Sequence, residues 1–71
     1  MSDKIIIYGK NGWPYTERAR EAYGNKAVYF NVKKDKNKLK EMLEYSNGSR
    51  NVPVIVEGEN VKIGYGGSWG V

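Results

Sequence analysis

The pattern of apolar and polar positions divides the chain into alternating strands and helices. Short β-branched or aromatic runs bounded by glycine, proline or polar residues predict strands, and apolar residues at a spacing of three and four predict helices. The predicted strands are Lys4–Tyr8, Ala27–Val32, Val52–Val56 and Val61–Tyr65, and the predicted helices are Pro14–Tyr23 and Lys36–Tyr45. The chain therefore has the order β-α-β-α-β-β.

Local residue chemistry supports the helix boundaries. Pro14 suits a first helical position, where a missing N–H has no cost, and Gly24 suits the C-terminal cap of the same helix. Asp35 is expected to cap the second helix. The apolar side chains that we assign to the core or its border are Tyr8, Tyr29, Phe30, Leu39, Met42, Leu43 and Ile55.

This order of elements predicts an α/β fold with helices packed on a four-stranded mixed sheet. The first strand is expected to lie between the second and the third, parallel to the second and antiparallel to the third. Ala27–Val32 is almost continuously apolar, which suits a strand covered on both faces. Pro53 must lie at the start of its strand because it cannot donate to a central ladder. Gly58-Glu59-Asn60 is the expected hairpin loop.

Composition indicates one small globular domain over residues 1–71. The chain is 39% hydrophobic and 28% charged, which is usual for a soluble protein. No apolar run approaches the roughly 20 residues of a membrane helix. Met1–Lys4 leads into a strand without the apolar segment of an export signal. We therefore expect a monomer in the cytoplasm.

Charge and missing residue types limit the chemistry. The net charge is +4, from 12 basic and 8 acidic residues. Five lysines gather around the start of the second helix with acidic residues close by, as on an ordinary solvated surface; they are Lys33, Lys34, Lys36, Lys38 and Lys40. The chain has no cysteine and no histidine, which removes disulfides, the common zinc sites, and thiol or imidazole catalysis. We expect no bound metal and no nucleic-acid partner.

The turn Gly12-Trp13-Pro14-Tyr15-Thr16, where the first strand passes into the first helix, is the stretch best suited to chemistry. Gly9 and Gly12 supply backbone freedom for a tight turn. A helix N-terminus presents unpaired N–H groups and the positive end of the helix dipole, which favour a thiolate, a carboxylate or a phosphate. Yet position 13 is tryptophan, so no nucleophile stands at this corner.

Three segments carry a resemblance to the glutaredoxin family. Lys10–Thr16 resembles the family's active-site turn, in which a cysteine precedes Pro-Tyr and a second cysteine, a serine or a threonine follows. Asn51-Val52-Pro53 is similar to the cis-proline loop, and Ile63–Ser68 is similar to the glycine pair near the glutathione site. The likeness extends over nearly the whole chain in the same order. Many members continue into a last helix, which in this chain is missing or very short.

The resemblance implies a thioredoxin-like fold and a parent activity of glutathione-linked thiol or selenol disulfide exchange, with glutathione as co-substrate and no bound cofactor. Trp13 takes the nucleophile's position and Thr16 that of the second cysteine, so a cysteine at 13 would act alone. The chain as written is expected to be inactive. Its partners would be glutathione or a disulfide-containing small molecule or protein, and we expect no association with a membrane. The alternative is a non-catalytic module that binds glutathione or an extended peptide.

The resemblance also implies a set of glutathione-binding residues: Lys10, Tyr15, Val52, Pro53, Gly66, Gly67 and Ser68. Each has a structural alternative. Lys10 could be an ordinary solvated lysine, Tyr15 a packing residue on the helix face, and Gly66–Ser68 part of a flexible tail. The Val52 backbone would pair with a peptide-like ligand or only form a turn. The Val52–Pro53 bond is predicted to be cis.

The resemblance places Trp13 where the family carries its cysteine nucleophile. It places Trp69 where some relatives carry another cysteine. The opal codon, which can encode selenocysteine, differs by a single base from both the cysteine and the tryptophan codons. One hypothesis is that the parent contains selenocysteine and that both positions became tryptophan. The alternatives are a natural, redox-silent relative and a chain whose cysteines were deliberately replaced. We expect Trp69 to lie in a flexible, glycine-rich tail.

Overall fold

The computed structural model describes residues 4–71, and the expectation about the start of the chain falls partly on residues 1–3, outside the described part. Along the chain the elements are β1 (Ile5–Gly9), α1 (Pro14–Tyr23), the short 3₁₀ helix η1 (Gly24–Lys26), β2 (Ala27–Asn31), α2 (Lys36–Tyr45), β3 (Asn51–Val52), β4 (Val54–Glu57), β5 (Asn60–Ile63) and β6 (Trp69–Gly70). Within this part of the chain, no helix has the length and apolar character needed to cross a membrane.

Four strands form a mixed sheet in the order β2-β1-β4-β5. β1 is parallel to β2 and antiparallel to β4, which confirms its predicted central place. β4 and β5 are antiparallel, with Glu57 opposite Asn60. Because these two residues are already paired, the hairpin turn is Gly58-Glu59 alone, and Asn60 begins a strand rather than ending the loop. The fold is thioredoxin-like, as the order of elements and the family resemblance predict.

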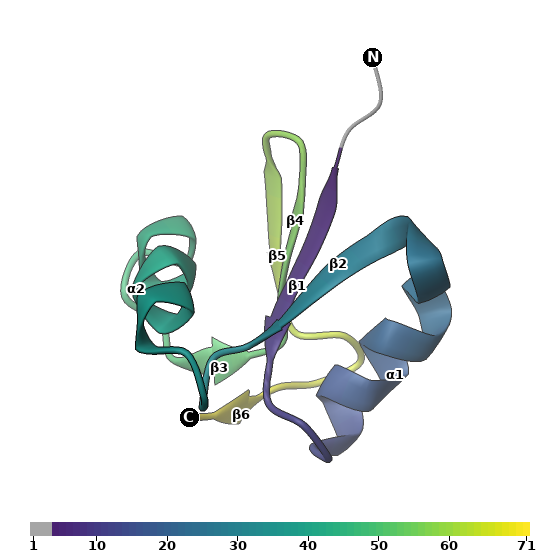
Figure 1. Ribbon diagram of the computed structural model, residues 1–71, viewed down its shortest axis with the longest axis horizontal. Coiled ribbons are helices and arrows are strands. Elements are labelled where there is room, and N and C mark those ends of the chain that lie inside the picture. The colour runs from purple at the N-terminus through teal and green to yellow at the C-terminus, as the bar shows by residue number, and fades with distance from the viewer. Residues whose placement is uncertain (1–3) are drawn as a thin grey trace.

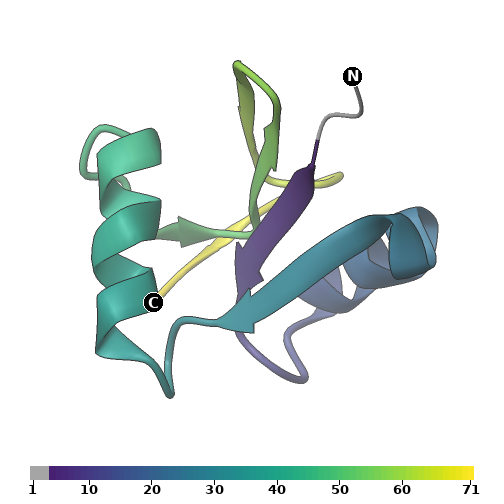
Figure 2. The same cartoon turned by 45° about the horizontal axis from the view of Figure 1, so that its top comes forward.

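The two helices cover opposite faces of the sheet (Figure 1), and the turned view separates them in the same way (Figure 2). Ile7 and Ile55 form a buried cluster with Ala19 of α1, whereas Tyr8 belongs to a second cluster with Met42 of α2. Neighbouring residues of β1 serve both clusters because successive strand side chains point to opposite faces. The other predicted core residues pack at the borders of these clusters: Tyr29, Phe30, Leu39 and Leu43.

Both helices end or begin on the predicted capping residues. Gly24 follows α1 with φ +57°, and its N–H donates to the Arg20 carbonyl. The Asp35 carboxylate accepts from two backbone N–H groups in the first turn of α2, at 3.0 and 3.3 Å. Such an N-terminal cap contributes about 1 kcal/mol to stability. Local hydrogen bonds thus mark these two helix boundaries.

β2 differs from its prediction because it lies at the edge of the sheet. Its side chain Val28 is 41% exposed, so the strand is not covered on both faces. The strand predicted over Val52–Val56 is divided at Pro53, whose peptide bond with Val52 is cis. β5 ends at Ile63 because the next residue, Gly64, has φ +95° and donates its N–H to the Pro53 carbonyl at 2.7 Å.

The prediction of a flexible tail is wrong, because residues 69 and 70 form a strand. β6 pairs antiparallel with β3, with Trp69 opposite Val52 and Gly70 opposite Asn51. The Val71 N–H donates to the Arg50 carbonyl at 2.9 Å, and the Arg50 guanidinium donates to the Val71 carbonyl at 2.7 Å. Backbone pairing with β3 therefore fixes the end of the tail, and the C-terminus lies on the α2 side of the sheet (Figure 1).

Candidate functional site

The candidate site lies where β1 passes into α1. Gly12 shapes the intervening turn with φ +82°. Trp13 is the N-cap of α1: its N–H donates to the Lys10 carbonyl at 3.2 Å and its carbonyl accepts from the Glu17 N–H at 2.9 Å. The Trp13 side chain makes no capping hydrogen bond. Position 13 therefore stands directly before the first helical turn, as the sequence predicts.

An indole ring fills the position that the family resemblance assigns to the nucleophile. Trp13 is half-buried and packs against the core cluster on the α2 side of the sheet. The Lys10 ammonium nitrogen lies 4.9 Å from the centroid of the Trp13 ring. A contact of this kind contributes about 0.5–1 kcal/mol at an exposed site. Lys10 is thus held over position 13 by an aromatic ring, while its predicted role with a glutathione carboxylate stays a prediction.

Thr16 is fully buried beneath this corner, at 0% exposure. Its Oγ1 accepts from the backbone N–H of Lys10 at 3.4 Å, a long hydrogen bond. A Cβ atom at Gly9 would lie 2.5 Å from Thr16 Cγ2 and 2.7 Å from Thr16 Oγ1. Glycine is therefore required at position 9 because a side chain would clash with Thr16. This corrects its predicted role of giving the turn backbone freedom. Thr16 locks the start of α1 against the end of β1.

Three aromatic residues form what we call the aromatic cluster: Trp13, Tyr15 and Trp69. The Trp13 and Trp69 ring centroids are 5.6 Å apart with planes at 70°, and those of Tyr15 and Trp69 are 5.9 Å apart at 88°. Edge-to-face pairs of this kind contribute about 0.5–1.5 kcal/mol beyond the area they bury. Trp69 is 48% exposed, so it forms the outer wall of the cluster.

The glycine pair has one packing role that the sequence analysis does not foresee. A Cβ atom at Gly67 would collide with the Tyr15 ring, so the absence of a side chain makes room for the aromatic cluster. The Gly67 carbonyl also accepts from the Tyr65 N–H at 2.9 Å. Gly66 is exposed and has φ +77°, which favours glycine. Ser68 is half-buried.

Val52 and Pro53, the predicted cis-proline loop, are both buried next to this corner. The structure thus brings together segments from the whole length of the chain: the turn before α1, the loop at β3 and the glycine-rich stretch. Tyr15 reaches Gly67 and Trp69, and the pairing of β3 with β6 joins Val52 to the same group. These contacts are the geometric basis of the candidate site.

Glu17 also belongs to the site, although the sequence analysis assigns it no role there. Its Oε2 accepts from the Gly12 N–H at 2.9 Å and lies 3.3 Å from the Arg20 guanidinium. The carboxylate therefore holds the turn, and Arg20 partly neutralises its charge. The available sequence signal is an acidic residue in the first turn of a helix, close to a glycine turn.

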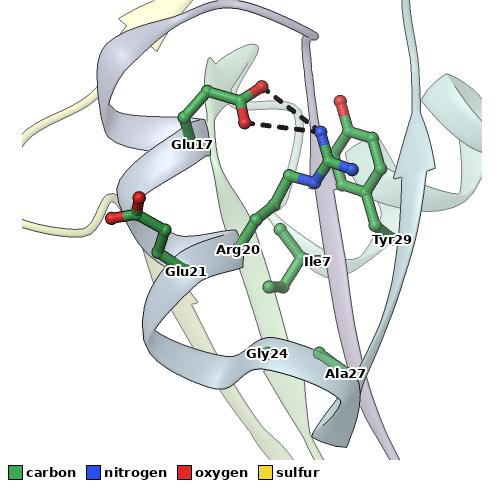
Figure 3. A pocket seen from close by; sticks show the side chains of 7 residues that line it. All are labelled: Ile7, Glu17, Arg20, Glu21, Gly24, Ala27 and Tyr29. Atoms are coloured by element: carbon green, nitrogen blue, oxygen red, sulfur yellow. Dashed lines mark hydrogen bonds and ion pairs between the residues drawn. The ribbon is translucent and has the colours of Figure 1, made fainter.

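An open pocket of about 370 Å³ lies between α1 and β2 (Figure 3), and no residue of the aromatic cluster lines it. Its lining residues are Ile7, Glu17, Arg20, Glu21, Gly24, Ala27 and Tyr29. Arg20 lies 4.0 Å from the Tyr29 ring centroid and pairs with Glu17, and the Tyr29 hydroxyl donates to Asn11 at 2.6 Å. Burial raises the pKa of Tyr29, with Arg20 opposing and Glu17 adding to this effect. The central charged pair is thus already satisfied within the chain, so we do not assign a ligand here.

Comparisons with known proteins give the family and the fold. The family model described as Glutaredoxin matches residues 5–61, a range that includes the turn before α1 and Pro53. Among solved structures, the glutaredoxin (grx-1) from Archaeoglobus fulgidus is similar, with a TM-score of 0.76 and 24% identity over 89% of this chain and 76% of that chain. A comparison with curated proteins gives no match.

Proposed function

The chain belongs to the glutaredoxin family, and on that premise we propose that its candidate site is built for glutathione-linked thiol or selenol disulfide exchange, with Trp13 making this chain inactive in that reaction. Family membership supports an oxidoreductase-like role. The observation that carries the finer proposal is the position of residue 13, which is the N-cap of α1 and lies beside Lys10. We propose the cytoplasm as the setting and a monomer as the working form.

The exchange needs a thiolate or a selenolate at position 13. This anion would attack the glutathione sulfur of a mixed disulfide, forming a new bond to that sulfur and releasing the other thiolate, which takes up a proton. A glutathione thiolate would then attack the sulfur of the bound glutathione, which yields oxidised glutathione and restores the anion at position 13. Thr16 has no thiol, so the second step depends on free glutathione.

The start of α1 supports an anion at this position. The N–H groups of Tyr15 and Thr16 have no carbonyl partner within the helix, and the helix dipole is positive at this end. Lys10 adds a positive charge close by. Glu17 opposes it, but the Gly12 N–H and Arg20 already engage its carboxylate. The balance favours a lowered pKa for a thiol at 13.

We propose that glutathione lies along the loop at β3 and the glycine-rich stretch. Lys10 would pair with a glutathione carboxylate, and the Val52 backbone would pair with the peptide-like part of the ligand. The other glutathione-binding residues would be Tyr15, Pro53, Gly66, Gly67 and Ser68. In Trp13→Cys protein, adding Lys10→Ala should therefore raise the KM for glutathione while the far-ultraviolet circular dichroism spectrum stays unchanged.

The test is glutathione-dependent reduction of a small mixed disulfide by Trp13→Cys protein. We expect turnover from this variant and none from the unaltered chain. Trp13→Ser is the matched control, because serine has a hydroxyl in place of the cysteine thiol, and it should also show no turnover. Trp69→Cys alone should give far less turnover, because residue 69 lies in β6 and not at a helix N-terminus. A folded Trp13→Cys protein without turnover would refute the proposal.

A binding module is the second candidate, and the indole ring at position 13 is the observation that favours it. In this case the unaltered chain would bind S-methylglutathione, which cannot undergo exchange, and Trp13→Cys would gain no turnover. Titration calorimetry with S-methylglutathione measures that binding directly. No heat of binding combined with full turnover by Trp13→Cys would exclude the module.

The selenocysteine hypothesis for the parent is tested on the coding DNA. Opal codons at positions 13 and 69 would support it, since such a codon can specify selenocysteine. Ordinary tryptophan codons at both positions, in the source genome, would contradict it.

A further inference from the structure

β6 lies along the edge of β3 that the proposed ligand would use. The Val71 N–H donates to the Arg50 carbonyl at 2.9 Å, and Trp69 stands opposite Val52. In an antiparallel ladder, hydrogen-bonded and non-hydrogen-bonded residue pairs alternate. The bond between residues 50 and 71 therefore makes Val52 and Trp69 the next hydrogen-bonded pair. The backbone N–H and carbonyl of Val52 are directed at the chain's own tail.

The side chains of the tail cover the same corner. Trp69 stacks edge-on against both Trp13 and Tyr15, and the Val71 carbonyl accepts from the Arg50 guanidinium at 2.7 Å. These contacts are enough to define one register for the tail. They are also few, since β6 has two residues and Trp69 is 48% exposed. An element with so few buried contacts can open locally at low free-energy cost.

We propose that residues 69–71 form an internal strap that occupies the ligand-pairing edge of β3, so that a peptide-like ligand must displace it in order to bind. The inference rests on the proposed function, because that function makes Val52 the pairing residue for glutathione. The strap mimics such a ligand: it is extended and antiparallel to β3, and its side chain at residue 69 lies over position 13.

The apparent affinity for ligand equals the affinity of the open form multiplied by the fraction of molecules in which the strap is open. A strap that is closed in about nine molecules of ten would weaken ligand binding about tenfold. Opening the strap permanently should recover that factor. The change should appear in the KM for the glutathione mixed disulfide and leave kcat nearly unchanged, since the strap takes no part in the exchange itself.

The first experiment compares Trp13→Cys protein with the same protein carrying Val71→Pro, which removes the N–H that donates to Arg50. We expect the KM to fall at least about fivefold with kcat within about twofold. Asn60→Ala, an exposed change on β5, is the matched control and should leave both constants unchanged. An unaltered KM in folded Val71→Pro protein would overturn the strap.

The second experiment does not depend on turnover. A synthetic peptide with the sequence of residues 65–71 is titrated into the Val71→Pro chain by calorimetry, beside the same peptide with alanine at the tryptophan position. We expect the first peptide to bind at least about tenfold more tightly, because it restores the stacking on Trp13 and Tyr15 as well as the pairing. Equal binding of the two peptides, or none, would overturn the strap.

The two experiments separate the strap from the proposed function. If Trp13→Cys protein shows no turnover but the tail peptide binds the Val71→Pro chain, the strap is supported and the exchange activity is refuted. If Trp13→Cys protein shows turnover, but Val71→Pro does not change its KM and the tail peptide does not bind, the exchange activity is supported and the strap is refuted.

Discussion

Trp13 and Trp69 stand edge to face across the candidate site, with ring centroids 5.6 Å apart and planes at 70°. This contact joins the N-cap of α1, the proposed position of the nucleophile, to a strand at the other end of the sequence. It also explains how the two tryptophans of the chain are used: one caps α1 and the other covers it. Any ligand that reaches position 13 must displace or accommodate Trp69.

The Trp13–Trp69 pair should contribute measurably to stability. Trp13→Ala and Trp69→Ala are combined in a double-mutant cycle, with free energies of unfolding from urea titrations. We expect a coupling of about 0.5–1.5 kcal/mol, the value usual for aromatic pairs in contact. Strictly additive effects would show that the contact contributes nothing in solution.

Gly9→Ala should destabilise the chain through a clash with Thr16. The added methyl group would meet Thr16 Cγ2 and Oγ1 at 2.5 and 2.7 Å, and overpacking of this kind costs about 1–3 kcal/mol. Much of this loss should disappear in a Thr16→Ala background, because both clashing atoms are gone. Gly70→Ala is the matched control, since its nearest neighbour would lie at an ordinary 3.5 Å. Thermal unfolding of all four variants measures the effect; an equal loss in both backgrounds contradicts the clash.

Tyr8 should make stability fall at alkaline pH. Its hydroxyl donates to Glu41 Oε1 at 3.0 Å, and burial first, then this carboxylate, raise the Tyr8 pKa far above its ordinary value. The folded state thus favours the neutral hydroxyl. The resulting stability is complete below the unfolded pKa of about 10 and is lost as pH rises towards the folded pKa.

Tyr8→Phe isolates this contribution. At neutral pH the variant should lose about 1.5 kcal/mol with the hydrogen bond to a charged group. Its free energy of unfolding should then decline less steeply than that of the unaltered chain between about pH 9 and 11. Denaturant titrations across this range supply the comparison, and parallel declines would contradict a role for Tyr8.

The elements of the main sheet and both helices could be predicted because their signals are local. A β-branched run specifies β1, Gly24 ends α1, and Asp35 begins α2, each through its own side chain or backbone preference. β3 and β6 could not be predicted in this way. Each has two residues, and β6 lies in a glycine-rich stretch, so their pairing exists only through contact between distant segments.

The same distinction applies to the candidate site. Trp13 and Thr16 could be placed from the turn alone, since Pro14 sets the start of the helix. The role of Gly67 depends on where the Tyr15 ring lies, and that of Glu17 on a hydrogen bond back to Gly12. The Gly67 contact follows from tertiary packing and the Glu17 contact from a local side-chain hydrogen bond, and the periodicity of apolar residues encodes neither.

The pKa of a cysteine thiol introduced at position 13 tests most directly whether the start of α1 still stabilises an anion. The thiol of Trp13→Cys is titrated through its ultraviolet thiolate absorbance, beside that of Asn60→Cys on the exposed strand β5, which lies away from any helix N-terminus. We expect the thiol at 13 to titrate below the ordinary value of about 8.5 and below the control. A folded Trp13→Cys protein whose thiol titrates at or above the control would contradict the proposed site.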